Sequence, residues 1–150
     1  MEKLNFPKYD LQIKNIENKD YIFDPVRKKW LLCKPEEWVR IHCINYIIQT
    51  KGYPTSYISI EHQIEVYGLK KRFDLLVYSA KLLPFILIEC KSPSVKINQN
   101  TFDQIIQYNL KLKCPYLMIT NGLNHYVCSV NQNEKRIEFI DSIPFYSNQK

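Results

Sequence analysis

The spacing of apolar positions predicts an amphipathic helix that begins at Pro35 and ends before Gly52. Proline suits a first helical position, and two glutamates in the first turn complement the positive end of the helix dipole. From Ile41 onward, isoleucines recur at helical spacing. Glu37 lies four residues before Ile41, so we expect this acid to point toward the core from the same face.

The rest of the pattern predicts a sheet interrupted by a second helix. The elements follow in this order: strands at 60–66, 72–78 and 85–91, a helix at 98–112, a strand at 116–120, and an edge hairpin at 125–130 and 136–140. A strand, helix and strand in succession form a parallel pair, whereas the preceding hairpin is antiparallel. We therefore predict an α/β (α+β) fold with a mixed central sheet flanked by helices, in the order α-β-β-β-α-β with an extra C-terminal hairpin.

The length of 150 residues fits one domain. We expect residues 1–19 to form an N-terminal extension, residues 20–145 the folded domain, and residues 146–150 a frayed tail. Residues 20–33 alternate between apolar and polar and predict a short hairpin or extended arm ahead of the core.

The scarcity of glycine excludes two classes of nucleotide-binding protein. Gly52, Gly68 and Gly122 cannot supply a GxxxxGK[ST] phosphate loop or a GxGxxG dinucleotide turn. We therefore expect no nucleotide cofactor, and neither a P-loop motor nor a Rossmann enzyme. Lysine and arginine number 21 against 15 acidic residues, and the net charge of +6 permits an anionic partner without identifying one.

The cysteines and the apolar runs indicate a cytoplasmic protein. The five cysteines are odd in number, widely spaced and never arranged as CxxC, so we expect reduced thiols. The first twenty residues contain no apolar secretory segment. The longest apolar run, residues 82–88, is far shorter than the roughly 20 residues that span a bilayer, so we expect no association with a membrane.

Three charged residues interrupt apolar strands and mark a candidate active site. Asp74 stands within the second predicted strand, and Glu89 and Lys91 end the central one. Side chains alternate along a strand, so Glu89 and Lys91 share a face while Cys90 points away and offers its backbone carbonyl. If the two strands pair side by side, Asp74 lies near Glu89 and Lys91.

Two carboxylates buried together are costly unless a cation or a proton compensates them, and hard oxygen ligands suit Mg²⁺ that keeps several waters. We therefore predict a metal held by Asp74, Glu89 and the Cys90 carbonyl. Such a metal can hold a phosphodiester and lower the pKa of a bound water. Lys91 could position or deprotonate that water and stabilise the developing charge. The pattern predicts phosphodiester hydrolysis, with DNA as the first partner to test.

A lone E-x-K tripeptide at a strand end is more often a surface ion pair than a catalytic group. Three further features favour catalysis here. Asp74 precedes the tripeptide by one strand, the tripeptide follows an apolar strand, and Gln104 and Tyr108 lie one turn apart on one face of the second predicted helix. The set is far more specific than any of its members.

A basic run directly before Asp74 comprises Lys70, Lys71 and Arg72. Such runs are usually solvated surface, but this one also fits contacts to nucleic-acid phosphates near the site. The histidines at 42, 62 and 125 have neither ligand nor triad spacing, and Cys90 lies in an apolar strand. We expect structural roles for these four residues.

The candidate site resembles the PD-(D/E)XK nuclease signature, with Asp74 followed by Glu89-Cys90-Lys91 after a hydrophobic strand. Residues 104–108, Gln-Ile-Ile-Gln-Tyr, resemble the additional Q-x-x-x-Y motif of recombination nucleases and type I restriction enzymes. Over about residues 20–145 the chain is similar to small stand-alone proteins classed with the N-terminal nuclease domain of type I restriction R subunits. The segments that carry this similarity are 23–29, 35–40, 52–54, 89–93 and 120–122.

The resemblance implies a restriction-endonuclease-like core over residues 20–145. It implies that Asp74 and Glu89 bind Mg²⁺, for which Mn²⁺ is the expected substitute. Glu37 matches the acid of the first helix that some members use as an additional metal ligand.

The resemblance also implies that Lys91 serves catalysis, and that Gln104 and Tyr108 support the site or the DNA backbone. Phe73 replaces the proline of the PD element, a change that does not touch the chemistry. An R subunit continues into an ATP-driven translocase, whereas this sequence contains no P-loop, so we expect a nuclease domain without the motor.

The leading hypothesis is a Mg²⁺-dependent DNA endonuclease or exonuclease domain. Its expected partners are DNA together with other restriction-system subunits or a second copy in a homodimer. The alternative is a catalytically silent DNA-binding or assembly subunit that keeps the nuclease fold and binds DNA in a salt-sensitive way without metal. A purely structural interaction protein is the third hypothesis, and it predicts neither DNA binding nor a response to Mg²⁺.

Overall fold

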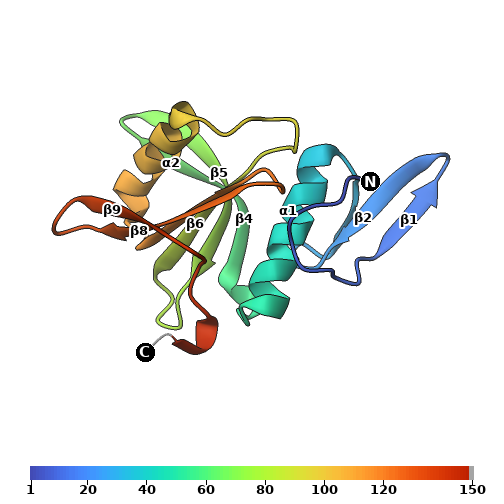
Figure 1. Ribbon diagram of the computed structural model, residues 1–150, viewed down its shortest axis with the longest axis horizontal. Helices are drawn as coiled ribbons and strands as arrows, with labels where there is room; N and C mark the ends of the chain where they lie inside the picture. The colour runs from blue at the N-terminus through green and yellow to red at the C-terminus, as the bar shows by residue number, and fades with distance from the viewer. Residues whose placement is uncertain (149–150) are drawn as a thin grey trace.

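The protein consists of a six-stranded sheet between two helices, with a smaller sheet beyond one of them (Figure 1). A computed structural model describes the backbone of residues 1–148, and it leaves the side chains of residues 61–64, 66, 71, 72 and 148 undescribed. In Figure 1 the first helix lies between the large sheet and the N-terminal three-stranded sheet, and the second helix covers the other face of the large sheet.

The N-terminal sheet is antiparallel and comprises β1 (Ile13–Ile16), β2 (Lys19–Asp24) and β3 (Lys29–Leu32). The remaining elements are α1 (Pro35–Asn45), the π-helical turn η1 (Tyr46–Thr50), the short 3-10 helix η2 (Thr55–Tyr57), β4 (Ile58–Val66), β5 (Leu69–Tyr78), β6 (Pro84–Cys90), α2 (Gln99–Leu112), β7 (Tyr116–Thr120), β8 (His125–Asn131), β9 (Arg136–Ile140) and the 3-10 helix η3 (Tyr146–Asn148). Neither α-helix of the described chain has the length and apolar character that crossing a membrane requires.

The strands of the large sheet follow the order β4-β5-β6-β7-β8-β9. β6 and β7 pair in parallel because α2 connects them as a crossover, and the other neighbours pair antiparallel. The predicted mixed sheet, the order α-β-β-β-α-β and the C-terminal hairpin are confirmed.

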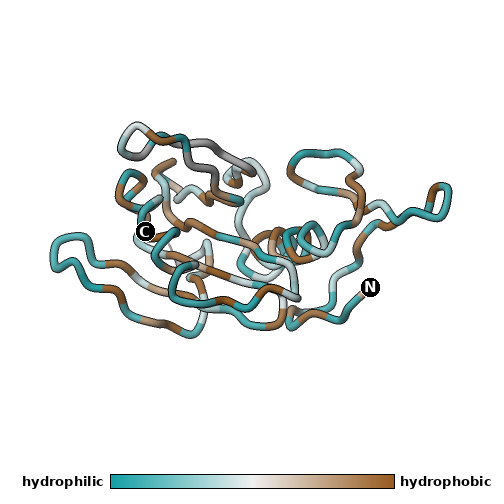
Figure 2. The backbone as a smooth tube through the Cα atoms, turned by 90° about the horizontal axis from the view of Figure 1, so that it is seen from above, coloured by the Kyte–Doolittle hydropathy of each residue, from teal (hydrophilic) through white to brown (hydrophobic). Residues whose placement is uncertain are grey.

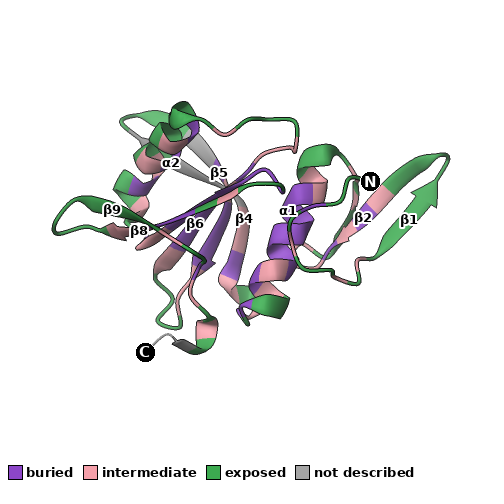
Figure 3. Ribbon diagram, viewed as in Figure 1, coloured by how far each residue is buried: buried purple, intermediate pink, exposed green. Residues whose placement is uncertain are grey.

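The alternation of β6 divides the core into two clusters. Ile86, Ile88 and Cys90 pack beneath α1, whereas Leu87 packs beneath α2 against Ile105. Burial follows the central strands and the inner face of α1 in Figure 3. Figure 2 shows the complementary pattern, with hydrophilic positions gathered at hairpin turns such as the one between β8 and β9. The large sheet is therefore covered on both faces, as the apolar run of β6 predicted.

Several predicted boundaries differ from those observed. The first helix changes to π geometry after Asn45 instead of continuing regularly to Gly52. The predicted N-terminal extension contains β1, which the sequence analysis missed, and its boundary falls within β2. The predicted frayed tail begins at Tyr146, but its backbone N–H donates a hydrogen bond to the Lys51 carbonyl and its ring packs edge-on against Tyr53. His42 is buried, and its Nδ1 lies within hydrogen-bond distance of the Trp38 carbonyl.

Residues 1–11, the N-terminal arm, are fixed to the loop that follows β7. The Asn5 N–H donates a 2.7 Å hydrogen bond to the Gly122 carbonyl, and the buried Leu4 side chain lies against Gly122. A Cβ added at Gly122 would lie 2.8 Å from Leu4 Cδ2 and 3.0 Å from Val39 Cγ2. The absence of a side chain at Gly122 therefore allows the arm to approach α1.

Substitution of Gly122 tests this contact, and Gly52 provides a matched control. Both glycines have positive φ, +87° and +82°, but a Cβ at Gly52 meets nothing within 4 Å. We expect Gly52→Ala to lower the free energy of unfolding by about 1 kcal/mol through backbone strain alone. Gly122→Ala should lose about 2–3 kcal/mol because Leu4 is also displaced. Urea unfolding measures both, and equal losses would show that the arm contributes nothing at this position.

Candidate active site

The antiparallel pairing of β5 with β6 brings the predicted acids to one end of the sheet. Leu75 lies opposite Ile88, which places Asp74 beside the end of β6. The Cys90 backbone N–H donates a 2.8 Å hydrogen bond to Asp74 Oδ2. The side-by-side pairing expected from the sequence is therefore confirmed.

Asp74 stands where β5 changes the face to which its side chains point. Phe73 packs in the cluster beneath α2 and Leu75 in the cluster beneath α1, although residues two apart on a regular strand share a face. The Asp74 carboxylate lies at this irregularity, where Oδ1 accepts a 2.9 Å hydrogen bond from Arg40 Nη2 of α1. One carboxylate oxygen is thus held by α1 and the other by β6.

Glu89 is a strongly perturbed carboxylate. Burial and then the charge of Asp74 raise its pKa to about 7, against the opposing effect of Lys91. Lys91 Nζ lies 3.2 Å from Glu89 Oε1, whereas Oε2 is buried and meets no hydrogen-bond partner within the described chain. A buried, unpartnered carboxylate oxygen is unfavourable, so this site favours the binding of a cation or a proton.

Lys91 keeps its positive charge at neutral pH. Burial opposes that charge, but the carboxylates of Glu89 and Asp74 outweigh burial and raise the pKa of Lys91 above its ordinary value. A lysine that retains its proton is a poor general base and a suitable electrostatic partner for an anion. Of the roles predicted for Lys91, the geometry favours stabilisation of developing charge.

Helix α2 brings one member of the predicted Gln104 and Tyr108 pair close to the acids. Tyr108 is half-buried, and burial followed by the charge of Glu89 raises the pKa of its hydroxyl, with Lys91 opposing. Gln104, one turn earlier on the same helix, is exposed. The charges of Glu89 and Lys91 therefore act on the Tyr108 hydroxyl, whereas the Gln104 side chain is exposed to solvent.

Arg40 is the site residue that the sequence analysis missed. Its buried guanidinium binds the carboxylates of Glu37 and, at 3.3 Å, Glu36, in addition to that of Asp74. Burial opposes the charge, but Asp74 and Glu37 raise the pKa of Arg40 above its ordinary value. The spacing could have revealed it, because Arg40 follows Glu36 by four residues and Glu37 by three, and side chains at these separations pair on a helix.

The two acids of the first helical turn differ in their surroundings. Glu37, predicted as an additional metal ligand, is bound by Arg40 at Oε1 and by Arg27 Nη2 at Oε2, the latter at 3.3 Å. For Glu36, burial and the charge of Asp74 raise the pKa, while Arg40 and Lys91 lower it. Both oxygens of Glu37 are engaged by arginines, and its role as a ligand stays a prediction.

The remaining predicted residues lie at the margins of the site. Cys90 is fully buried, and its thiol contact with Cys43, together with burial, raises its pKa, which favours the structural role predicted for this side chain. Lys70 is exposed near the start of β5. The side chains of Lys71 and Arg72 lie outside the described residues, so the predicted phosphate contacts stay a prediction.

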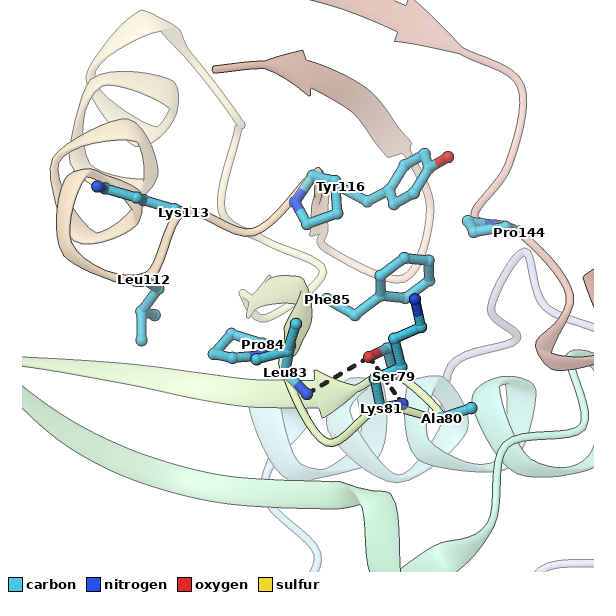
Figure 4. Close-up of a pocket in the computed structure, with 11 residues that line it drawn as sticks. Ser79, Ala80, Lys81, Leu83, Pro84, Phe85, Leu112, Lys113, Tyr116 and Pro144 are labelled. Atoms are coloured by element: carbon cyan, nitrogen blue, oxygen red, sulfur yellow. Dashed lines mark hydrogen bonds between the residues drawn. The ribbon is translucent and has the colours of Figure 1, made fainter. Parts of the chain in front are cut away.

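A cavity of about 640 Å³ lies at the opposite end of the strands from Glu89 (Figure 4). Phe85 and Tyr116 pack edge-on within it, at the start of β6 and β7. The Ser79 hydroxyl accepts hydrogen bonds from the backbone N–H groups of Lys81 and Leu83, which shapes the adjoining turn. This cavity carries none of the acids described above, so it does not coincide with the candidate chemistry at the end of β6.

The donor set at the end of β6 fits a hard divalent cation. Asp74 and Glu89 act on each other electrostatically, and one Glu89 oxygen is buried without a partner. Within the part of the chain that the structure describes, no three His, Cys, Asp or Glu side chains are arranged to hold a metal. Two carboxylates and a backbone carbonyl suit Mg²⁺, which keeps several waters, better than a closed structural zinc site.

The mixed sheet, the flanking helices and the acids at the strand ends define an α/β domain with a restriction-endonuclease-like fold. A fragment structure assigned to an HsdR subunit of a type I restriction enzyme from Vibrio vulnificus YJ016 matches with a TM-score of 0.50 at 17% sequence identity. The match covers 71% of this chain and 22% of that chain, so this chain corresponds to less than a quarter of the matched protein's length. At this identity the match shows the fold.

The family is shown by sequence. The model of the type I restriction enzyme R protein N terminus matches residues 35–144, and the chain belongs to this family. No curated protein matches the chain. The predicted resemblance to the N-terminal domain of type I restriction R subunits is confirmed.

The pKa of Glu89 predicts how stability depends on pH. Folding raises this pKa from 4.5 to about 7, so the folded state holds the proton over a range in which the unfolded state has lost it. The Glu89 contribution to stability is therefore lost as pH rises through that range. Glu89→Gln should remove this dependence and raise the free energy of unfolding at pH 8, in EDTA, by about 1–3 kcal/mol.

Urea unfolding between pH 5 and pH 8 tests this expectation. Glu138→Gln is the control, because Glu138 is exposed on β9 and pairs with Arg136. The assignment of an unfavourable buried charge to Glu89 fails if the Glu89→Gln and wild-type stability curves run parallel over this pH range.

Proposed function

We propose that this chain is a Mg²⁺-dependent nuclease domain that hydrolyses DNA phosphodiester bonds. The observation that carries the proposal is the buried, unpartnered Glu89 Oε2 beside Asp74 and the charged Lys91. This arrangement is unfavourable for an isolated protein and favourable for one that binds a divalent cation and a phosphate. If Glu89 and Lys91 formed only a surface ion pair at a strand end, Glu89 would have no buried oxygen without a hydrogen-bond donor.

Asp74, Glu89 and the Cys90 carbonyl would hold the ion. When bound, Mg²⁺ would supply Lewis-acid stabilisation of the phosphate and a water of lowered pKa. The protein's own part is orientation, because the Cys90 N–H and Arg40 fix the two oxygens of Asp74. Each carboxylate oxygen has a second lone pair, so these hydrogen bonds leave room for a cation.

Lys91 would stabilise the negative charge that develops on the phosphate. Its ammonium group is anchored by Glu89 and keeps its proton, so it is fixed before the substrate arrives. Tyr108 would donate a hydrogen bond to the same phosphate or to a water beside it, with Gln104 at the rim contacting the DNA backbone. The substrate would therefore be contacted from two elements, by Lys91 directly after β6 and by Tyr108 and Gln104 on α2.

The partner proposed is DNA, acting with other subunits of a restriction system. The net charge of +6 and the exposed Lys70 favour a polyanion. The family is defined by R proteins of type I restriction enzymes, in which the present domain is one part of a longer chain. Translocation is not part of the activity proposed for these residues.

Cleavage of supercoiled, linear duplex and single-stranded DNA in Mg²⁺ tests the proposal. We expect EDTA to abolish cleavage, and Lys91→Ala or Glu89→Ala to reduce its rate by at least about 100-fold, the scale of losing one transition-state contact. Lys81→Ala is the matched lysine control, because Lys81 is exposed at the opposite end of the sheet.

Two outcomes would contradict the proposal. Cleavage that survives EDTA, or that persists equally in the Lys91 and Glu89 variants, would point to a contaminating or unrelated activity. Salt-sensitive DNA binding with no metal requirement and no cutting, tested with the other restriction subunits added, would instead favour a silent DNA-binding subunit.

The Tyr108 hydroxyl is tested by a change that keeps its ring in the core. Tyr108→Phe should reduce the cleavage rate about 10-fold through loss of one hydrogen bond, while the melting temperature changes little. Tyr116→Phe on β7 is the control for removing a tyrosine hydroxyl, since Tyr116 packs against Phe85 at the opposite end of the strands from Glu89. An unchanged rate for Tyr108→Phe would restrict Tyr108 to packing.

A further inference from the structure

Arg40 supplies the positive charge for a group of three carboxylates. Its guanidinium lies between α1 and β5, only 4% exposed, and contacts the carboxylates of Glu36, Glu37 and Asp74. Without a cation at this point, the three negative charges would repel one another. Here an arginine, which stays charged under all ordinary conditions, supplies that cation.

The Arg40 guanidinium is also held in place through Glu37. Glu37 uses its second oxygen to bind Arg27 Nη2, and Arg27 Nε binds Asp24, which is fully buried at the end of β2. The backbone N–H groups of Val26 and Arg27 donate to the same Asp24 carboxylate. A continuous row of ion pairs thus runs from the N-terminal sheet to Asp74, and it fixes Arg40 in place.

The charges of this network leave room for one divalent ion. The ion pairs named above and the Glu89–Lys91 pair contain five carboxylates and three cations, so these eight residues together carry an excess of two negative charges when all are ionised. The unpartnered oxygen lies on Glu89, which forms its ion pair with Lys91, whereas Arg40 binds Asp74 at Oδ1. Charge and geometry agree that the open position is beside Glu89.

We infer that Arg40 replaces a second metal ion, and that the site binds a single divalent cation between Asp74 and Glu89. This inference rests on the proposed function and specifies its cofactor requirement. Arg40 is a positioning residue: it orients Asp74 and neutralises Glu36 and Glu37 without contacting the substrate. Glu36 and Glu37 are then partners of arginine and not of the metal.

Metal stoichiometry measured by calorimetry tests the inference. The protein is stripped with EDTA, dialysed and titrated with Mn²⁺ and, separately, with Mg²⁺. Wild type should bind one equivalent. Arg40→Met, which removes the charge but keeps most of the length, should bind a second equivalent with an affinity within about tenfold of the first, because the three carboxylates are freed. Arg40→Lys, which restores a charge, should return to one.

Arg136→Met is the matched control, since Arg136 also bridges two glutamates, Glu134 and Glu138, on the exposed β9 hairpin. Removal of an arginine there should leave one equivalent bound. Circular dichroism establishes that each variant is folded before titration. If Arg40→Met does not fold, the wild-type value decides, because one bound ion supports the inference and two overturn it.

The outcomes separate this inference from the proposed function. Two ions bound by wild type would overturn the role of Arg40 while leaving a metal-dependent nuclease in place. No ion bound by wild type would overturn both. One ion bound by wild type and by folded Arg40→Met would show that Arg40 does not exclude a second cation.

Discussion

The ion pair between Arg40 and Asp74 is the contact on which the organisation of the site depends. It joins residues 34 positions apart and links α1 to the second strand of the large sheet, at the point where the apolar core gives way to charge. Breaking a buried pair by removing one partner leaves an uncompensated charge, which costs about 3–5 kcal/mol. The same contact that fixes Asp74, the acid proposed to bind the metal, also links the helix that covers the sheet to β5.

Much of the fold could be predicted because local patterns and tertiary packing agree. The proline start of α1, the apolar run of β6 and the crossover through α2 each have one reasonable interpretation. The strand β1 escaped prediction because its Ile13 and Ile16 are both exposed, so it shows no buried alternation. The π turn after Asn45 escaped because its spacing of apolar residues resembles that of an ordinary helix.

The acids of the site could be found from sequence, but their surroundings could not. Glu89 and Lys91 are conspicuous because charges end an apolar strand. Arg40 is not, because one more charge on an amphipathic helix is expected on its solvent side. Asp74 lies at the point where the inward-facing side chains of β5 change from one face of the sheet to the other. Strict alternation along a strand therefore cannot predict the face to which the Asp74 side chain points. Such an irregularity is set by the neighbouring strand and helix, which a local pattern does not contain.

The N-terminal arm has a consequence for how the protein is made. Asn5 and His125 are 120 residues apart, yet the Asn5 carbonyl lies 2.5 Å from His125 Nε2, and the Phe6 ring packs on the same histidine. The arm is translated before β8 and before the loop that follows β7, and translation proceeds at about 5–20 residues per second. For several seconds, then, Phe6 lacks its partner on β8 and Leu4 lacks Gly122, although the contacts of Phe6 with α1 and η1 can already form. The packing of the arm is complete only after β8 has been made, and until then these apolar side chains are accessible to chaperones.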